Sequence, residues 1–315
     1  MSPVEMTGPM MLRTLAAATL AGCLALAACA SYPRDDVAKM RFVEAAGVST
    51  HVETWGAGAP VLLIHGASSH IGTWRPTIVP LLKDKYLVAA YDRPGMGYTT
   101  DRPAGSDTLE IQAKVAAGVI EQLGLKKPIV VAHSWGGAVA LRLALDRPDL
   151  VGGLVLIAPV AYEWPGGVDW YNYWSANPIS GWLFNNLVAQ PFAGASVKSG
   201  MEGAFAPSIP PDGWMEKAEV SLAARPGSLR ANGEDLVAAK REVSAQQARY
   251  PQIEIPVAIL VGDGDRVVSP SIHALKLAQV LPNARIDVVQ GAGHLPHEAA
   301  PDRFMKLFDW VQSSK

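Results

Sequence analysis

The chain has 315 residues, of which 49% are hydrophobic and 18% are charged. This composition is typical of a folded protein with a substantial core and excludes a disordered chain. The formal net charge of −2 offers no basic surface for nucleic acid, and the length allows one large α/β domain or two small ones.

The first predicted element is an export signal. Arg13 supplies a positive charge, and the apolar run 15–28 is too short to span a bilayer comfortably. The run ends at Cys29, and the segment 26–29 resembles a bacterial lipoprotein signal, in which the cysteine becomes the lipidated first residue. We favour Cys29 over Cys23 because polar residues follow Cys29; an ordinary cleaved signal or an uncleaved anchor helix is the alternative. We therefore expect a signal segment at 1–29, a tether at 30–38, and a membrane-anchored lipoprotein of the bacterial cell envelope, facing the periplasm or the exterior.

Alternating strands and helices are expected after the tether. Two alternating segments, 39–44 and 49–55, predict a hairpin around Gly47. Apolar runs predict further strands at 61–64, 87–91, 129–132, 154–157, 257–261 and 286–289. Helical spacing predicts helices at 109–123, with Ser106 or Asp107 as its N-cap, and at 138–145, 271–281 and 301–311. Strands that alternate with helices form a mostly parallel sheet with right-handed crossovers.

The segment 160–251 breaks this alternation. It is rich in proline and glycine and carries many aromatic residues, among them Trp170, Trp174, Trp182, Phe192 and Trp214. An irregular loop of that length is improbable in a compact domain. We therefore predict a helical insertion over the carboxyl ends of the strands, with some of its rings lining a cavity.

Four polar loops follow predicted strands: HGASS at 65–69, AHSWGG at 132–137, GDGDRVV at 262–268 and GAGHLPHE at 291–298. Ligands of an open parallel sheet bind outside the carboxyl ends of its strands. A serine, an acid and a histidine should therefore meet at one edge, in the chain order Ser134, Asp265, His294. In a fifth loop, Asp92 and Arg93 are interpreted as residues that stabilise a turn.

Ser134 lies at a sharp strand-to-helix turn. Such a turn pushes a serine hydroxyl out above the sheet, where a substrate and a base can reach it. Ala132 and Gly136, two residues before and after it, are small enough for the turn. The amide of Trp135 falls at the start of the following helix, where donors and the helix dipole favour a developing oxyanion.

These features resemble the α/β-hydrolase family over roughly residues 40–314. The resemblance implies a core at 39–159 and 252–315 with about eight strands and helices on both faces, and a helical cap at 160–251. By likeness, Ser134 is the nucleophile, His294 the base and Asp265 the acid, and the amides of Ala67 and Trp135 form the oxyanion hole. One departure is Ala132, where the family usually has glycine.

The resemblance implies a serine hydrolase that forms an acyl-enzyme from a small-molecule ester with apolar groups. We expect no cofactor. We also expect no metal, because His51, His70 and His273 show no ligand spacing. The membrane partner would be reached through the lipid anchor.

Several alternatives stay open. Asp263 is the rival acid, and His297 is the rival base. Other serine members of the family include carbon–carbon bond hydrolases, proline iminopeptidases, acyltransferases and cofactor-free haloperoxidases. A lipid-anchored binding module with an idle triad is a further possibility, because a fold alone does not prove activity.

Overall fold

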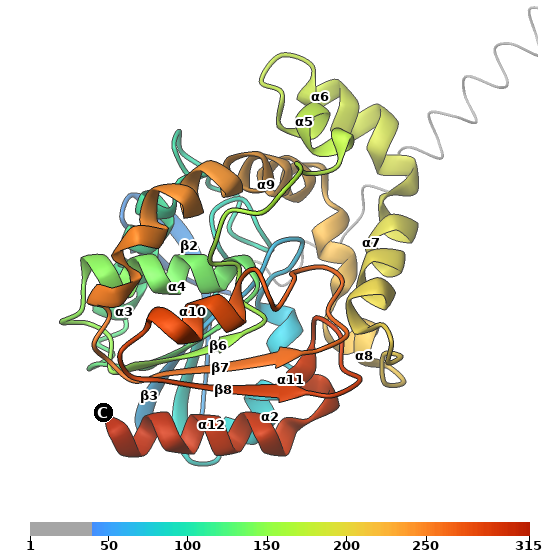
Figure 1. Cartoon of the computed structure of the whole chain (residues 1–315). Helices are drawn as coiled ribbons and strands as arrows, with labels where there is room; N and C mark the ends of the chain where they lie inside the picture. Colours follow the sequence, from blue (N-terminus) through green and yellow to red (C-terminus); the bar gives the residue numbers. More distant parts are fainter. Residues whose placement is uncertain (1–39) are drawn as a thin grey trace, which may run out of the picture. The chain divides into compact units, whose positions relative to one another are not determined.

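The computed structural model describes residues 40–315. The predicted signal segment, with Cys29, and the predicted tether lie outside these residues. Eight strands form one sheet in the order β1-β2-β4-β3-β5-β6-β7-β8 (Figure 1). The strands are β1 (Arg41–Ala45), β2 (Val48–Trp55), β3 (Ala59–Ile64), β4 (Tyr86–Tyr91), β5 (Ile129–His133), β6 (Gly153–Ile157), β7 (Val257–Gly262) and β8 (Ala284–Val289).

Strands β1 and β2 form the antiparallel edge of the sheet. Ala46 and Gly47 join them with φ angles of 52° and 79°, and Ala45 pairs with Val48. Two positive φ angles in a two-residue loop give the backbone twist that suits a tight hairpin. From β4 to β8 every ladder is parallel.

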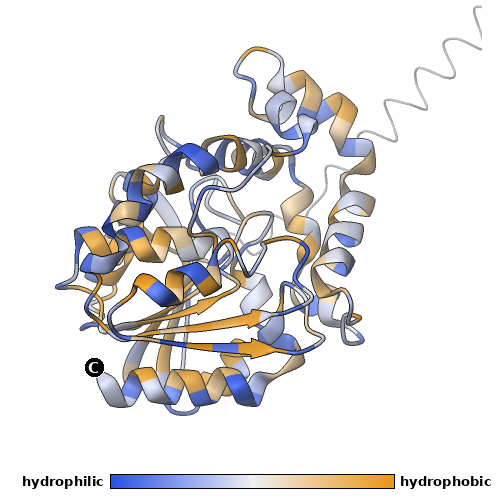
Figure 2. Cartoon of the chain, in the orientation of Figure 1, coloured by the Kyte–Doolittle hydropathy of each residue, from blue (hydrophilic) through white to orange (hydrophobic). Residues whose placement is uncertain are grey.

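Helices cover both faces of the parallel strands. Alternate residues of β3 face opposite sides: Leu62 and Ile64 pack in one buried cluster, and Val61 and Leu63 pack in the other. The first cluster contains side chains of α3 (Leu109–Gln122), α4 (Trp135–Asp146) and α10 (Ala274–Val280). The second contains side chains of η2 (Ile71–Trp74), α2 (Ile78–Leu82) and α12 (Pro301–Ser314). The short helix α11 (Pro296–Ala299) comes directly before α12 in the chain. The predicted α/β class, a mostly parallel sheet with helices on both faces, is confirmed, and the strands that can be seen in Figure 2 are mostly hydrophobic.

Some local predictions were wrong. The N-cap of α3 is Thr108, whose side chain accepts the amide of Ile111, and Ser106 instead donates to the carbonyl of Pro103. The helix begins at Leu109, as predicted, so the N-cap is the residue directly before it, and its hydroxyl lies three residues before Ile111. Helix α4 begins at Trp135 and not at 138, because the strained turn at Ser134 allows the helix to start at once. The short elements η2 and α2 were not predicted.

Between β6 and β7 the chain is helical. The elements are α5 (Trp170–Ala176), α6 (Gly181–Leu183), the π-helical η3 (Phe184–Ala189), α7 (Gln190–Phe205), α8 (Trp214–Lys217), η4 (Val220–Ala224), α9 (Pro226–Gln246) and η5 (Gln247–Gln252). Helix α5 packs closely on α9, since a Cβ at Gly233 would lie 2.9 Å from the carbonyl oxygen of Asn172. No helix within residues 40–315 is both long and apolar enough to cross a membrane.

Candidate active site

Asp265 and His294 meet beyond the carboxyl ends of β7 and β8. His294 Nδ1 donates to Asp265 Oδ2 at 2.7 Å, and both side chains are buried. The other carboxylate oxygen, Asp265 Oδ1, accepts the amides of Val267 and Val268 at 2.8 and 2.9 Å. Because the proton is on Nδ1, Nε2 of His294 is free to accept a second proton. The rival acid, Asp263, instead accepts the amide of Gly291 at 2.7 Å.

Ser134 lies between β5 and α4 with φ 54° and ψ −122°. This conformation is strained for any residue other than glycine and is characteristic of functional sites. Gly136 is required beside it, because a Cβ there would lie 2.4 Å from the carbonyl oxygen of Ile64. A Cβ on Gly66 would lie 2.9 Å from the Cβ of Ser134. The turn therefore holds the serine against the loop 65–69.

His133 brings this turn to the loop that carries His294. Its Nε2 lies 3.0 Å from the carbonyl oxygen of His294, and the two ring centroids are 4.6 Å apart. Among the hydrogen bonds of residues 40–315, none joins Ser134 to His294. Such bonds are commonly long in unliganded enzymes and shorten when substrate binds. The structure thus gathers the three predicted side chains at one edge, with the histidine–aspartate bond formed.

Two backbone amides are available beside Ser134. Within the described part of the chain, neither the amide of Ala67 nor that of Trp135 donates a hydrogen bond. The neighbouring amide of Ser68 is occupied, since it donates to Asn232 Oδ1 of α9 at 2.7 Å. Unpaired amides at a helix start and in a facing loop form a site for negative charge.

Arg93 holds the loop with Ala67 in place, a role that the sequence did not reveal. Its buried guanidinium donates from Nε to the carbonyl of His65 at 3.1 Å and from Nη2 to that of Gly66 at 2.8 Å. Its Nη1 donates to Gln112 at 2.7 Å and to Asp235 of α9 at 2.6 Å. The interpretation of Arg93 as turn chemistry is therefore too narrow. No sequence signal links it to Asp235, which lies 142 residues away.

The other histidines near the site are neutral at pH 7. Burial, together with Arg93, lowers the pKa of His65 to about 3, and burial with the nearby His294 lowers the pKa of His297 to about 3. Burial and His294 also hold the pKa of His133 well below its usual value. His65 acts as a structural acceptor, since its Nε2 accepts the amide of Arg93 at 2.9 Å. Within residues 40–315, no three His, Cys, Asp or Glu side chains are placed to hold a metal ion.

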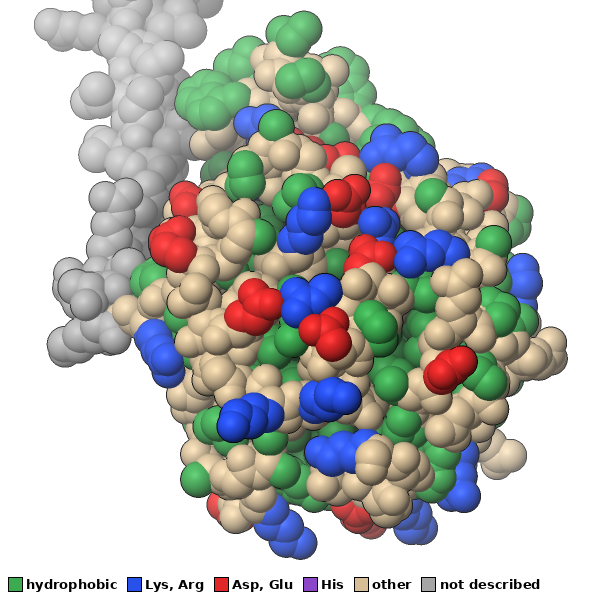
Figure 3. All heavy atoms as spheres, turned by 90° about the vertical axis from the view of Figure 1, so that its left-hand side faces the viewer, with side chains coloured by type: hydrophobic (Ala, Val, Ile, Leu, Met, Phe, Trp, Pro, Cys, Tyr) green, Lys and Arg blue, Asp and Glu red, His purple; other side chains and the backbone are tan. Residues whose placement is uncertain are grey.

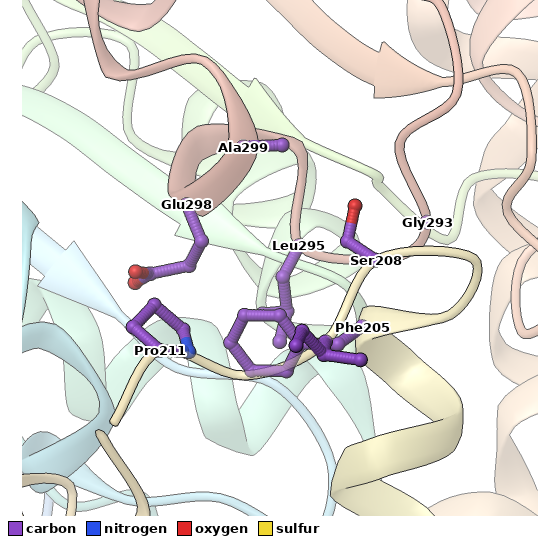
Figure 4. Close-up of a pocket in the computed structure, with 8 residues that line it drawn as sticks. Phe205, Ser208, Pro211, Gly293, Leu295, Glu298 and Ala299 are labelled. Carbon is purple, nitrogen blue, oxygen red and sulfur yellow. The ribbon is translucent and has the colours of Figure 1, made fainter. Parts of the chain in front are cut away.

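The end of α7 packs against the loop that carries His294 (Figure 4). The amide of His294 donates to the carbonyl of Ala204 at 2.8 Å. Phe205, Leu295 and Glu298 help to line a cavity of about 40 Å³ at this junction. A cavity of this size holds a few water molecules and is much smaller than a ligand pocket. The junction therefore positions the loop that carries His294 and is not a substrate pocket.

Comparison with known proteins gives one family and several relatives. The family model described as alpha/beta hydrolase fold matches residues 59–301. The 2-hydroxymuconate semialdehyde hydrolase of Pseudomonas putida is 28% identical over 285 residues, which cover 85% of this chain and 92% of that protein. The pimeloyl-[acyl-carrier protein] methyl ester esterase of Nitrosomonas europaea is 28% identical over 273 residues, which cover 83% of this chain and 98% of that protein.

Solved structures show the same fold. An esterase from Exiguobacterium antarcticum superposes with a TM-score of 0.70 at 20% identity, over 87% of this chain and 99% of that one. At this identity the likeness concerns the fold alone.

Proposed function

The chain belongs to the α/β-hydrolase fold family, and from that premise we propose that it is a serine hydrolase that cleaves carboxylic esters with apolar groups. The observation that carries the proposal is the Asp265–His294 bond beside a serine held at a strained positive φ. Such strain is kept where the surrounding structure requires it, and here it presents the serine to the histidine loop. The two available amides of Ala67 and Trp135 add the oxyanion site.

The residues account for each step of ester hydrolysis. Ser134 Oγ attacks the carbonyl carbon while His294 Nε2 takes the hydroxyl proton, and Asp265 stabilises the imidazolium that results. The carbonyl oxygen becomes an oxyanion that the amides of Ala67 and Trp135 stabilise. His294 then gives its proton to the leaving alkoxide, and the alcohol departs from an acyl-enzyme. Water, deprotonated by the same histidine, attacks the acyl carbon, and the acid is released as Ser134 regains its proton.

Arg93 is not available to bind a charged substrate. This arginine is the buried cation next to the oxyanion loop, and it is committed to Asp235, Gln112 and two backbone carbonyls. A substrate carboxylate would need a free cation or free donors, since an unpaired buried charge is costly. We further propose that the segment 160–251 serves as the cap of the site, supported by the contacts of Asn232 and Asp235 with the loops at 65–69 and 93.

A carbon–carbon bond hydrolase is the second candidate. The resemblance to the hydrolase of Pseudomonas putida favours it, since that protein's name gives 2-hydroxymuconate semialdehyde as its substrate. The same catalytic groups could attack the ketone carbon of a diketone. The two candidates differ in the bond that is cleaved, so substrates decide between them.

A panel of p-nitrophenyl esters of increasing chain length, run beside amide and diketone substrates, tests the proposal. We expect esters to turn over fastest, and a diketone that turns over far faster than every ester would overturn the ester assignment. Labelling with a fluorophosphonate tests the nucleophile: the wild-type protein should react and Ser134→Ala should not. An unreactive wild-type protein would favour the binding module over the enzyme.

We also propose that Cys29 is lipidated and anchors the protein in the bacterial cell envelope, facing the periplasm or the exterior. The support is the sequence pattern at 15–29, since these residues lie outside the described part of the chain. Metabolic labelling with a palmitate analogue should be lost in Cys29→Ser and kept in the matched control Cys23→Ser. Label that persists in Cys29→Ser would place the anchor elsewhere.

A further inference from the structure

The outward faces of α5, α6, η3 and the start of α7 are apolar. We call them the aromatic surface and define it by Trp170, Trp174, Ile179, Trp182, Leu187 and Phe192, each of which is more than half exposed. Ile179 is 90% exposed and Phe192 is 69% exposed. In Figure 3, hydrophobic side chains gather at the top of the described molecule, where α5 and α6 lie in Figure 1, and charged side chains lie below. A contiguous apolar patch of this kind marks a surface that binds something.

The polarity of these helices is inverted. In α5 and η3 the buried side chains are polar: Asn172, Ser175 and Asn185 are each less than 5% exposed. Ser175 Oγ lies 2.7 Å from Asn185 Oδ1 and 2.8 Å from the carbonyl oxygen of Leu229 on α9. A helix that faces water normally buries its apolar stripe and exposes its polar one. Here the polar groups make the internal contacts, and the large apolar groups are left outside.

The composition of the surface matches a lipid interface. From Trp170 to Val197 the sequence contains no Asp, Glu, Lys or Arg. Interfaces between proteins keep a polar, charged rim, whereas the acyl region of a bilayer excludes charge. Tryptophan and tyrosine, which are frequent here, favour the boundary between lipid headgroups and acyl chains.

The part of the chain that precedes the described residues also points to a bilayer. The run 15–28 is apolar, and Cys29 is 12 residues before Arg41, where β1 begins. Even fully extended, 12 residues reach roughly 40 Å. A chain attached at Cys29 would therefore keep Arg41, the first residue of β1, within this distance of the membrane.

We propose that the aromatic surface docks on a lipid bilayer, with the rings of α5, α6 and α7 inserted at the headgroup boundary. The proposal is independent of the reaction at Ser134. Helix α7 connects the two regions, since Phe192 near its start belongs to the aromatic surface and Ala204 near its end accepts the amide of His294. Docking would thus occur on the helix that positions the histidine loop.

The test measures whether a probe in the aromatic surface lies in water or in lipid. The full chain carries Cys23→Ser and Cys29→Ser, and a single NBD fluorophore is attached to Ile179→Cys. We expect its emission to be typical of water without vesicles. With vesicles of phosphatidylethanolamine and phosphatidylglycerol, it should shift to the blue and be quenched by spin-labelled lipids. The matched control is a probe at Lys126→Cys, an exposed position before β5 at the opposite end of the sheet, which should show neither change.

A second variant separates the aromatic surface from other membrane contacts. Trp182→Ser with Phe192→Ser changes two exposed side chains, and the folded structure should persist, as circular dichroism can verify. The blue shift at position 179 should then need at least about tenfold more lipid, because binding scales with the apolar area that is inserted. Vesicles of phosphatidylcholine and raised salt should change the result little, since the surface is uncharged.

Three results would overturn the proposal. One is emission at position 179 that is already apolar without vesicles, which would mean that a second copy or residues 1–39 cover the surface. Another is binding that disappears in salt or in phosphatidylcholine, which would assign docking to charged side chains. The third is vesicle binding of the whole chain that leaves the probe at position 179 in water.

Discussion

The loops at the carboxyl ends of the strands bury charged side chains, whereas the aromatic surface exposes apolar side chains. In the loops, charged groups are buried, and each is paired: Asp265 with His294, and Arg93 with Asp235. In the aromatic surface, large apolar groups are exposed, while Asn172 and Ser175 are buried. A buried charge is tolerated only when its partners are present, whereas an exposed ring costs little until it meets a partner. Changes in the loops should therefore reduce activity or stability, and changes in the aromatic surface should do neither in solution.

The largest effect is expected at Asp265, the acid of the proposed triad. Asp265→Asn should lower kcat for p-nitrophenyl ester hydrolysis by about 10⁴-fold, because an amide stabilises the wrong tautomer of the histidine. Asp263→Asn is the matched control, since Asp263 contacts the amide of Gly291 and not His294. It should keep activity within a few-fold of the wild type. Equal losses in both variants would remove the assignment of Asp265.

The next largest effect is expected at the buried ion pair of Arg93 and Asp235. Arg93→Met should lower the free energy of unfolding by about 3 kcal/mol, because it deprives a buried carboxylate of its partner. The loss should lie at the low end of the usual range, since Arg102 still pairs with Asp235 at 2.9 Å. Urea denaturation measures this change. Arg147→Met, in an exposed pair with Asp149, should leave the midpoint almost unchanged, and similar losses in both would contradict the role of burial.

A lower pH should reduce the stability of the folded protein, because its buried histidines are neutral. The folded chain holds the pKa of His297 at about 3, whereas the unfolded chain takes up the proton near the ordinary value of 6.5. The unfolded state therefore binds more protons below pH 6.5, and stability falls as the pH drops from 6.5 toward 3. In His297→Gln, the slope of unfolding free energy against pH between 6 and 4 should decrease by about 1.4 kcal/mol per pH unit. Urea denaturation across this range measures the slope, and an unchanged slope would mean that His297 is protonated in the folded state.

The smallest effect is expected on the aromatic surface. Trp182→Ser should change the unfolding free energy by no more than about 0.5 kcal/mol, because the side chain is 65% exposed. Trp214→Ser is the matched control: this ring is buried and packs edge-on against Phe205 with centroids 5.0 Å apart. Its loss should cost about 3–5 kcal/mol. Comparable losses in thermal or urea unfolding would show that Trp182 is part of the core and would break the contrast between the two regions.

The sequence by itself determined the elements whose signals are local. Apolar runs such as 129–132 and 257–261 predicted β5 and β7, because strands buried on both faces leave no polar alternation. The order of strands and helices predicted a parallel sheet, and a parallel sheet brings its carboxyl-end loops to one edge. For that reason the sequence alone predicted Ser134, Asp265 and His294 at one edge, although Ser134 and Asp265 lie 131 positions apart.

Only the tertiary structure decided which distant groups pair and which side of a helix faces inward. Arg93 was interpreted as part of a turn, and its pairing with Asp235 depends on how α9 lies across the loops. Some rings of the segment 160–251 were expected to line a cavity, but the sequence did not show that Trp170, Trp174 and Trp182 face outward. Helical periodicity shows that two faces differ, but the neighbouring helix decides which face is buried. Here α9 presents Gly233 and the carbonyl of Leu229, which accept the small polar side of α5 and leave the large rings no room inside.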